Sequence, residues 1–226
     1  TNTSNNFWGA VGITGANVKI TDMDTLDLGV STIGGTYDVI ATIGNITQSG
    51  SLTVSSASTF ETKAENGTIF CFDSSCTSAG DTNNAFSGTV ELTTTGSEAH
   101  AYIDNGTTAL VIAEDSSVGG DLRLVSGHAS GITDEDDGSL TVGGDLYATT
   151  DASNGVITLN GLAVSGDFYL NTIVLSNTGR AQAGAGSTIT LTSVAGVSTA
   201  DDFYNDMKVY ISSGTGAGQL RTISDY

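Results

Sequence analysis

One short pattern recurs along this chain: a glycine followed by two apolar residues that alternate with other residues. Gly-x-apolar-x-apolar begins at ten glycines: Gly9, Gly35, Gly50, Gly67, Gly88, Gly120, Gly138, Gly144, Gly155 and Gly166. The intervening residues are mostly polar, and alternation with a period of two places the apolar set on one face of a short strand. The leading glycine permits the positive φ that a tight corner requires. The pattern therefore predicts short strands joined by corners.

The apolar positions of this pattern are the ones that we expect to face the interior. They include Val11, Val39, Leu52, Val54, Val90, Leu92, Leu122, Leu140, Leu146, Ile157 and Phe168. No segment has the period of a capped amphipathic helix, apart from a weak turn at residues 200–204. The chain contains no proline, which would remove a donor from a β ladder. The sequence therefore predicts an all-β fold.

A longer repeat overlies the short one. The segment 6–11 returns at 84–90 and more faintly at 163–168, and its glycines Gly9, Gly88 and Gly166 are 79 and 78 residues apart. Such repetition is typical of a solenoid, in which neighbouring units cover each other's open hydrophobic ends. We expect residues 1–190 to form these repeats. Residues 191–226 should be a distinct β segment that is incomplete or is completed by a neighbour.

The net charge of −19 excludes a nucleic-acid binder, because phosphate contacts need Lys and Arg, and only 6 are present against 25 acids. It also argues against binding to anionic membrane surfaces. No apolar run reaches the ~18 residues of a transmembrane helix, so we expect no membrane span. Neither terminus has a cap, and no signal peptide begins at Thr1. We therefore expect a processed piece of something longer.

Several ordered motifs carry a family resemblance. They are Leu28-Gly29, Thr32-Ile33-Gly34-Gly35, the run from Gly44 to Val54, and Asn84-Ala85-Phe86-Ser87-Gly88-Thr89-Val90. These resemble the repeats of filamentous-haemagglutinin-like, two-partner-secretion-type adhesins, over about Asn5 to Gly179. The resemblance implies a right-handed parallel β-helix, extracellular placement and a fibrous, adhesive role. The sequence departs from it by an insertion from Phe72 to Asp81. We expect the β-helix to run from about Asn5 to Leu191.

The carboxy-terminal segment carries a second resemblance. Residues 202–211 lead into the glycine-rich run 213–221, and together they are similar to a short module of phage virion and tail-associated proteins. This similarity implies an alternative function, as a phage or virus-like virion fibre or tail protein.

Catalytic signals are weak. His100 and His128 have no neighbouring nucleophile or metal-spaced partner, and we expect each to be exposed or at a corner. A polysaccharide-acting β-helix enzyme, the second alternative, would gather carboxylates and a base on one strand face. The bases here lie far apart, so we expect no enzyme and no catalytic or cofactor-binding residue.

Two local features indicate structural sites. Asp134, Asp136 and Asp137 belong to an acidic loop that offers oxygen ligands for a structural Ca²⁺, although a solvated acidic loop explains the same residues. Cys71 should point inward and Cys76 lies in the insertion. In an oxidising exterior we expect a disulfide between them, the alternative being two free thiols.

The terminal strands predict self-association into a fibre or continuation in a longer chain. The residues expected at such a junction are Phe7, Trp8, Val209, Ile211, Leu220 and Ile223. Solenoid ends carry unpaired backbone groups that natural repeat proteins protect. The function expected from the sequence is a non-catalytic structural or adhesive segment of an extracellular or cell-surface fibre, with glycans as further partners.

Overall fold

The computed structural model describes residues 5–71, 76–78, 83–135, 139–152 and 155–172, and shorter segments at 183–185, 188–190, 208–211, 214 and 217–224. Contacts divide the chain into two compact units, Thr1–Leu175 and Ser176–Tyr226. The described secondary structure is β throughout, with no helix, and therefore no helix that could cross a membrane occurs in this part of the chain.

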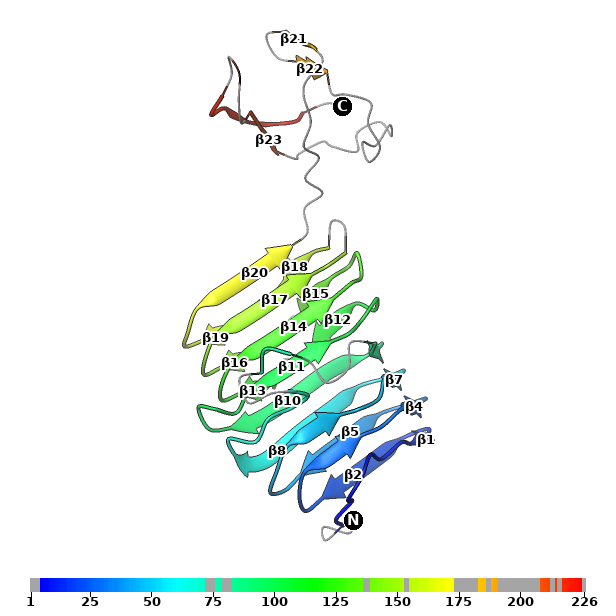
Figure 1. Cartoon of the computed structure of the whole chain (residues 1–226). Coiled ribbons are helices and arrows are strands. Elements are labelled where there is room, and N and C mark those ends of the chain that lie inside the picture. Colours follow the sequence, from blue (N-terminus) through cyan, green and yellow to red (C-terminus); the bar gives the residue numbers. More distant parts are fainter. Residues whose placement is uncertain are drawn as a thin grey trace. The chain divides into compact units, whose positions relative to one another are not determined.

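The first unit is a parallel β-solenoid of about seven turns (Figure 1). Successive turns place their strands side by side in three sheets, which we call sheets I, II and III. Sheet I contains β3 (Leu26–Leu28), β6 (Ile46–Gln48), β11 (Ala101–Asp104), β14 (Leu122–Ser126), β17 (Leu146–Thr150) and β20 (Phe168–Thr172). Single bridges from Ile46 to Ile69 and from Ile69 to Ala101 connect its two parts. All these pairings are parallel.

Sheets II and III form the other walls. Sheet II contains β1 (Thr14–Gly15), β4 (Ser31–Ile33), β7 (Leu52–Val54) and β9 (Ala85–Phe86). Sheet III begins with β2 (Val18–Asp22), β5 (Tyr37–Ala41), β8 (Ser58–Glu65) and β10 (Thr89–Thr95). It then forks into one row of β12 (Leu110–Ile112), β15 (Ile132–Asp134) and β18 (Ile157–Thr158), and another of β13 (Ser117–Val118), β16 (Thr141–Val142) and β19 (Ala163–Val164).

Most of the residues expected in the interior are there. Eight of them are at most 1% exposed: Val39, Leu52, Val54, Val90, Leu92, Leu122, Leu140 and Leu146. Val11 and Ile157 are half-buried and pack against the same core. The prediction for Phe168 is wrong, because this side chain is 49% exposed. It lies on β20, which pairs only with β17 among the described strands, so no described turn covers it.

One part of the core is a cluster of aromatic side chains. Phe60 makes edge-on contacts with Tyr37, Phe70 and Phe86, at centroid distances of 6.0, 4.8 and 5.7 Å. Edge-to-face pairs add stabilisation beyond the buried area. Phe70 reaches this cluster with a φ of 57°, at the point where the insertion leaves the solenoid.

The copies of the long sequence repeat share a local structure but lie on different faces of the solenoid. At Gly34-Gly35 a short strand of sheet II is followed by the long strand β5 of sheet III. At Gly119-Gly120 the same order, short strand, two glycines and long strand, leads from sheet III into β14 of sheet I. The motif has therefore moved by one face of the solenoid between its two copies.

Side-chain amides stabilise the place where sheet II ends. Asn105 is fully buried; its Oδ1 accepts the N–H of Phe86 at 2.7 Å, and its Nδ2 donates to the Phe86 carbonyl at 3.1 Å and to Ala109. The Oδ1 of Asn84 accepts the N–H of Leu52 at 3.0 Å. These amides take the role of a neighbouring strand, because buried backbone groups need partners.

The second unit contains two antiparallel hairpins. β21 (Ala183–Ala185) pairs with β22 (Thr188–Thr190), and β23 (Lys208–Tyr210) pairs with β24 (Leu220–Thr222). Contacts place the boundary between the two units after Leu175, and the expected boundary after residue 190 stays a prediction. The predicted all-β parallel β-helix with a distinct carboxy-terminal β segment is confirmed.

Candidate functional site

A column of polar side chains follows one corner of the solenoid. Each member directly precedes sheet I in its turn: Thr25, Asn45, Thr68, His100, Asp121, Asp145 and Asp167. We call this set the corner column. In most steps the side chain of one member accepts the backbone N–H of the member in the next turn.

The hydrogen bonds of the corner column fall into two runs. In the first, the N–H of Asn45 donates to Thr25 Oγ1 at 3.2 Å, and the N–H of Thr68 donates to Asn45 Oδ1 at 2.9 Å. In the second run, backbone N–H groups donate to His100 Nδ1, Asp121 Oδ1 and Asp145 Oδ1 at 2.8, 2.9 and 2.8 Å. Hydrogen bonds that end on a carboxylate are stronger than neutral ones.

Glycines beside the corner column make room for it. A Cβ on Gly144 would lie 2.2 Å from Asp121 Oδ1, and one on Gly166 would lie 2.2 Å from Asp145 Oδ1. At the neighbouring position, a Cβ on Gly143 would lie 2.2 Å from the carbonyl oxygen of Gly119. Successive turns approach so closely here that only glycine fits.

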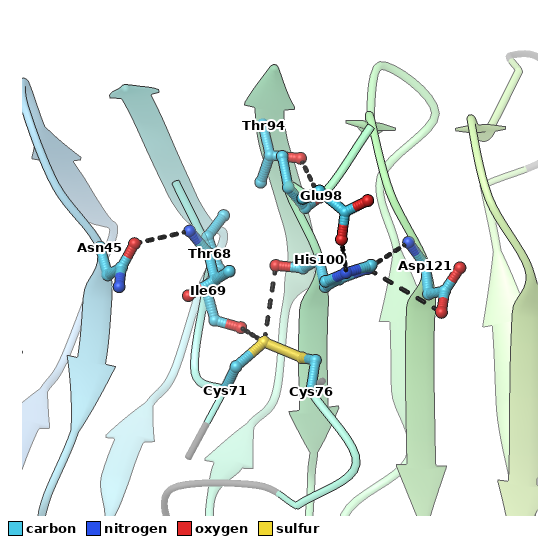
Figure 2. The surroundings of a disulfide bond; sticks show 10 residues. Asn45, Thr68, Ile69, Cys71, Cys76, Thr94, Glu98, His100 and Asp121 are labelled. Carbon is cyan, nitrogen blue, oxygen red and sulfur yellow. Dashed lines mark hydrogen bonds and ion pairs between the residues drawn. A yellow bond between two sulfur atoms is a disulfide. The ribbon is translucent and has the colours of Figure 1, made fainter. Parts of the chain in front are cut away.

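The two runs of the corner column are separated at the disulfide (Figure 2). The structure joins Cys71 and Cys76, with 4.7 Å between their Cα atoms. The Cys71 sulfur lies 3.5 Å from the carbonyl oxygen of Ile69 and 3.6 Å from that of His100. The bridge therefore ties Cys76, inside the insertion, to the residue that directly precedes the insertion. His100 is a corner residue, as expected, but only 8% exposed.

A second column of side chains, which we call the outer column, lies on the outer face of sheet I. Tyr102, Arg123, Tyr147 and Tyr169 are in register on four successive strands. The Arg123 guanidinium carbon lies 3.6 Å from the Tyr147 ring centroid, and the Tyr147 and Tyr169 rings stack with centroids 4.5 Å apart and planes 7° apart. Cation–π and stacking contacts of this kind stabilise the register of adjacent turns.

Carboxylates link the two columns. The Tyr147 hydroxyl donates to Asp145 Oδ2 at 3.1 Å, and the Tyr169 hydroxyl donates to Asp167 Oδ2 at 3.5 Å. Desolvation first, and then the Asp145 carboxylate, raise the pKa of Tyr147. The negative charge of Asp167 is the largest cause of the raised pKa of Tyr169.

The strand β20 exposes three neighbouring aromatic and apolar side chains. Phe168, Tyr169 and Leu170 are 49%, 47% and 58% exposed. Phe168 and Leu170 stand at inward positions, in register with the buried residues Leu146 and Ala148 of β17. Large exposed apolar groups gathered on one strand mark an interaction surface.

A polar groove of about 510 Å³ lies at the carboxyl ends of the sheet I strands, whereas the corner column lies at their amino ends. It is lined by Asn83, Asn84, Ala85, Asp104, Gly106, Thr107, Thr108, Gly127 and Asp151. Amides, hydroxyls and two carboxylates therefore surround it, and its lining contains no basic side chain. Such a lining offers hydrogen bonds to polar, uncharged ligands.

Of the three expected calcium ligands, only Asp134 is within the described residues; Asp136 and Asp137 lie outside them. The carboxylate of Asp134 accepts two hydrogen bonds from Asn160, at 2.6 and 3.3 Å. Within the described ranges, no three His, Cys, Asp or Glu side chains are grouped so as to hold a metal ion. Calcium binding by this loop stays a prediction.

The residues expected at an assembly junction belong to both units. Trp8 is 96% and Phe7 38% exposed in the first unit. In the second unit Val209, Ile211 and Ile223 are half-buried in or beside the hairpin of β23 and β24, and Leu220 pairs with Tyr210 in that hairpin.

Comparison with known proteins gives one match. Residues 15–70 match the model of a family described as "Repeats of unknown function (DUF5649)". This segment runs from the end of β1 to Phe70, two residues before the insertion. No curated protein and no solved structure was found to match the chain.

Reasoning from the sequence missed both columns. Members of the corner column differ in type, so no single-letter repeat reveals them. The available signal was positional: each member directly precedes an apolar strand residue and carries an acceptor atom. For the outer column the signal was an aromatic or arginine between the two apolar residues of the pattern, as in Leu122-Arg123-Leu124 and Phe168-Tyr169-Leu170.

Proposed function

We propose that this chain is a non-catalytic structural and adhesive segment of an extracellular fibre or giant surface adhesin. The observation that carries the proposal is the construction of the solenoid, in which consecutive turns are tied by backbone ladders, the corner column and the outer column. A stack of turns held together in this way is suited to bear load and to space binding surfaces.

Three further features support extracellular placement. The disulfide between Cys71 and Cys76 fits an oxidising compartment. The strongly acidic composition keeps a long repetitive chain soluble through self-repulsion. The outer faces of the sheets carry Thr, Asp, Glu and Tyr side chains, which make polar contacts with water and with partners.

The adhesive part of the proposal is supported by the polar groove. Its amides, hydroxyls and carboxylates, among them Asn83, Thr107 and Asp151, match the hydroxyl groups of neutral glycans. Two carboxylates without a basic side chain in the lining disfavour anionic sugars, because like charges repel at short range.

Localisation tests the proposal directly. Antibodies raised against residues 5–172 should label intact, unpermeabilised source material along fibres or at its outer surface. Label that appears only after permeabilisation would contradict the proposal. A matched antibody against a cytoplasmic protein of the same source controls for leakage.

A further inference from the structure

We propose that the open edge of β20 docks the first turn of a second copy of this chain, in the register that places Leu170 over Val11. The proposal rests on the fibre function proposed above and specifies the contact by which such a fibre would grow.

The apolar side chains of β20 are more exposed than the residues at the equivalent positions of the preceding sheet I strands. At the equivalent inward positions, Leu122, Leu124 and Leu146 are fully buried by their neighbouring turns. Phe168 and Leu170 occupy the same positions with about half of each side chain exposed. A further turn with apolar inward residues would remove this surface from water.

A further turn would also supply hydrogen-bond partners for the polar groups at β20. Asp145 and Asp121 each accept, through Oδ1, the backbone N–H that follows one turn later. Asp167 is the last described member of the corner column and directly precedes Phe168. No strand in the described part of the chain pairs with the outer edge of β20, and an open strand edge is the template for strand addition.

The first turn of the solenoid supplies a matching edge. Val11 bridges Leu28, the second inward residue of β3, and Leu170 is the second inward residue of β20. The N–H of Val11 donates to Asp27, and its carbonyl accepts from Gly29, so these bonds use one edge of the segment. Among the described strands, none pairs with the other edge.

The register also positions the flanking residues. Ala10 and Gly12 fall opposite Tyr169 and Asn171, where their small size avoids the stacked tyrosine ring. Trp8, at 96% exposure, lies at the edge of this junction.

The occupant is a second copy because the two edges belong to the same sheet of one unit. A copy translated along the solenoid continues sheet I without any new geometry. A head-to-tail contact of this type does not close on itself, and therefore it generates filaments.

Cross-linking of the full chain tests the register. Ala10→Cys and Tyr169→Cys are made as separate variants and mixed under mild oxidation, while the native cysteines remain bridged. We expect covalent heterodimers linked between positions 10 and 169, identified by mass spectrometry, well above the homodimers that each variant forms alone. Thr53→Cys, on the exposed face of β7, is the control that should not link to Tyr169→Cys.

A second variant tests the apolar contact. Leu170→Asp changes an exposed side chain, so the solenoid should fold, and sedimentation should show loss of the concentration-dependent association of the unchanged chain. An unchanged chain that stays monomeric at its highest soluble concentration overturns the proposal. If hydrogen exchange of the β20 amides is slow in that monomer, residues 176–226 of the same chain cover the edge of β20.

The outcomes separate the two proposals. Filaments without the link between positions 10 and 169 would overturn this register and leave the fibre function standing. A correct link together with purely internal localisation would overturn the fibre function and leave the contact standing.

Discussion

The carboxylate of Asp145 accepts the backbone N–H of Asp167, one turn further along the solenoid, at 2.8 Å. Its other oxygen accepts the hydroxyl of Tyr147 at 3.1 Å. One side chain therefore joins two successive turns and also connects the corner column to the outer column. The corner column supplies a side-chain ladder beside the backbone ladder of sheet I.

Removal of this carboxylate should destabilise the solenoid. Asp145→Ala leaves the N–H of Asp167 and the Tyr147 hydroxyl without these acceptors, and charge-assisted hydrogen bonds each contribute roughly 1.5–3 kcal/mol. Because the site is partly solvated, we expect a loss of about 1–3 kcal/mol in the free energy of unfolding, measured by urea denaturation. Asp145→Asn keeps an acceptor and should lose less. Asp115→Ala, at an exposed residue, is the control and should change the free energy of unfolding by less than about 0.5 kcal/mol. Equal losses in Asp145→Ala and Asp115→Ala would refute the stabilising role of the corner column.

The glycines beside the column should not tolerate a methyl group. In Gly143→Ala the new Cβ would lie 2.2 Å from the Gly119 carbonyl oxygen, and a backbone atom cannot move aside without displacing the turn. We expect a loss of about 1–3 kcal/mol, as for other overpacked sites. Gly9→Ala, which meets nothing within 4 Å, should be near neutral. A thermal melt of the two variants decides the matter, and similar melting temperatures would contradict the close approach.

The disulfide between Cys71 and Cys76 should make a modest contribution. The bond closes a loop of few residues, so the chain-entropy model gives less than the ~3 kcal/mol of a 15-residue loop. Reduction of the intact protein should add two hydrogen atoms to its mass and lower its melting temperature slightly. Cys71→Ala/Cys76→Ala should melt like the reduced protein. An unchanged mass on reduction would show that the bond is absent.

Tyr37 should make stability depend on alkaline pH. Burial raises the pKa of Tyr37 to about 12 from the ordinary value of 10.0, while the Ser31 hydroxyl acts in the opposite direction. The unfolded chain therefore loses this proton first. Tyr37 stabilises the fold fully below pH 10, and this stabilisation, about 2–3 kcal/mol at most, is lost as the pH rises towards 12.

Ultraviolet titration of tyrosinate measures this effect. Tyr37→Phe should remove this buried phenol and flatten the fall in stability between pH 10 and 12. Urea titrations of both proteins across this range provide the comparison. Identical slopes for the two proteins would contradict the assignment.

The strands themselves could be predicted from the sequence because their signal is local. Alternation after a glycine predicts β5, β7, β10, β14 and β17 directly, and Val39, Leu52 and Leu122 are buried as expected. The exposure of Phe168 could not be predicted in this way, since the pattern gives the side of the strand and not the presence of a covering turn.

The arrangement of turns was harder to predict for a physical reason. Gly34-Gly35 and Gly119-Gly120 look equivalent in sequence and have the same local structure, yet the strands that follow them lie in different sheets. Which face a motif occupies depends on the number of residues in every preceding turn, including the insertion from Phe72 to Asp81. The corner column was missed for a related reason, because hydrogen bonding needs an acceptor atom at each member and not a particular residue type.

In the fibre that we propose, the turns of the solenoid continue from one copy of the chain to the next. Electron cryomicroscopy of the purified chain, at increasing concentration, tests this claim most directly. We predict filaments that lengthen with concentration and show a repeat of about 4.8 Å along their axis, the spacing of hydrogen-bonded strands. Isolated particles at every concentration, with no such repeat, would contradict it.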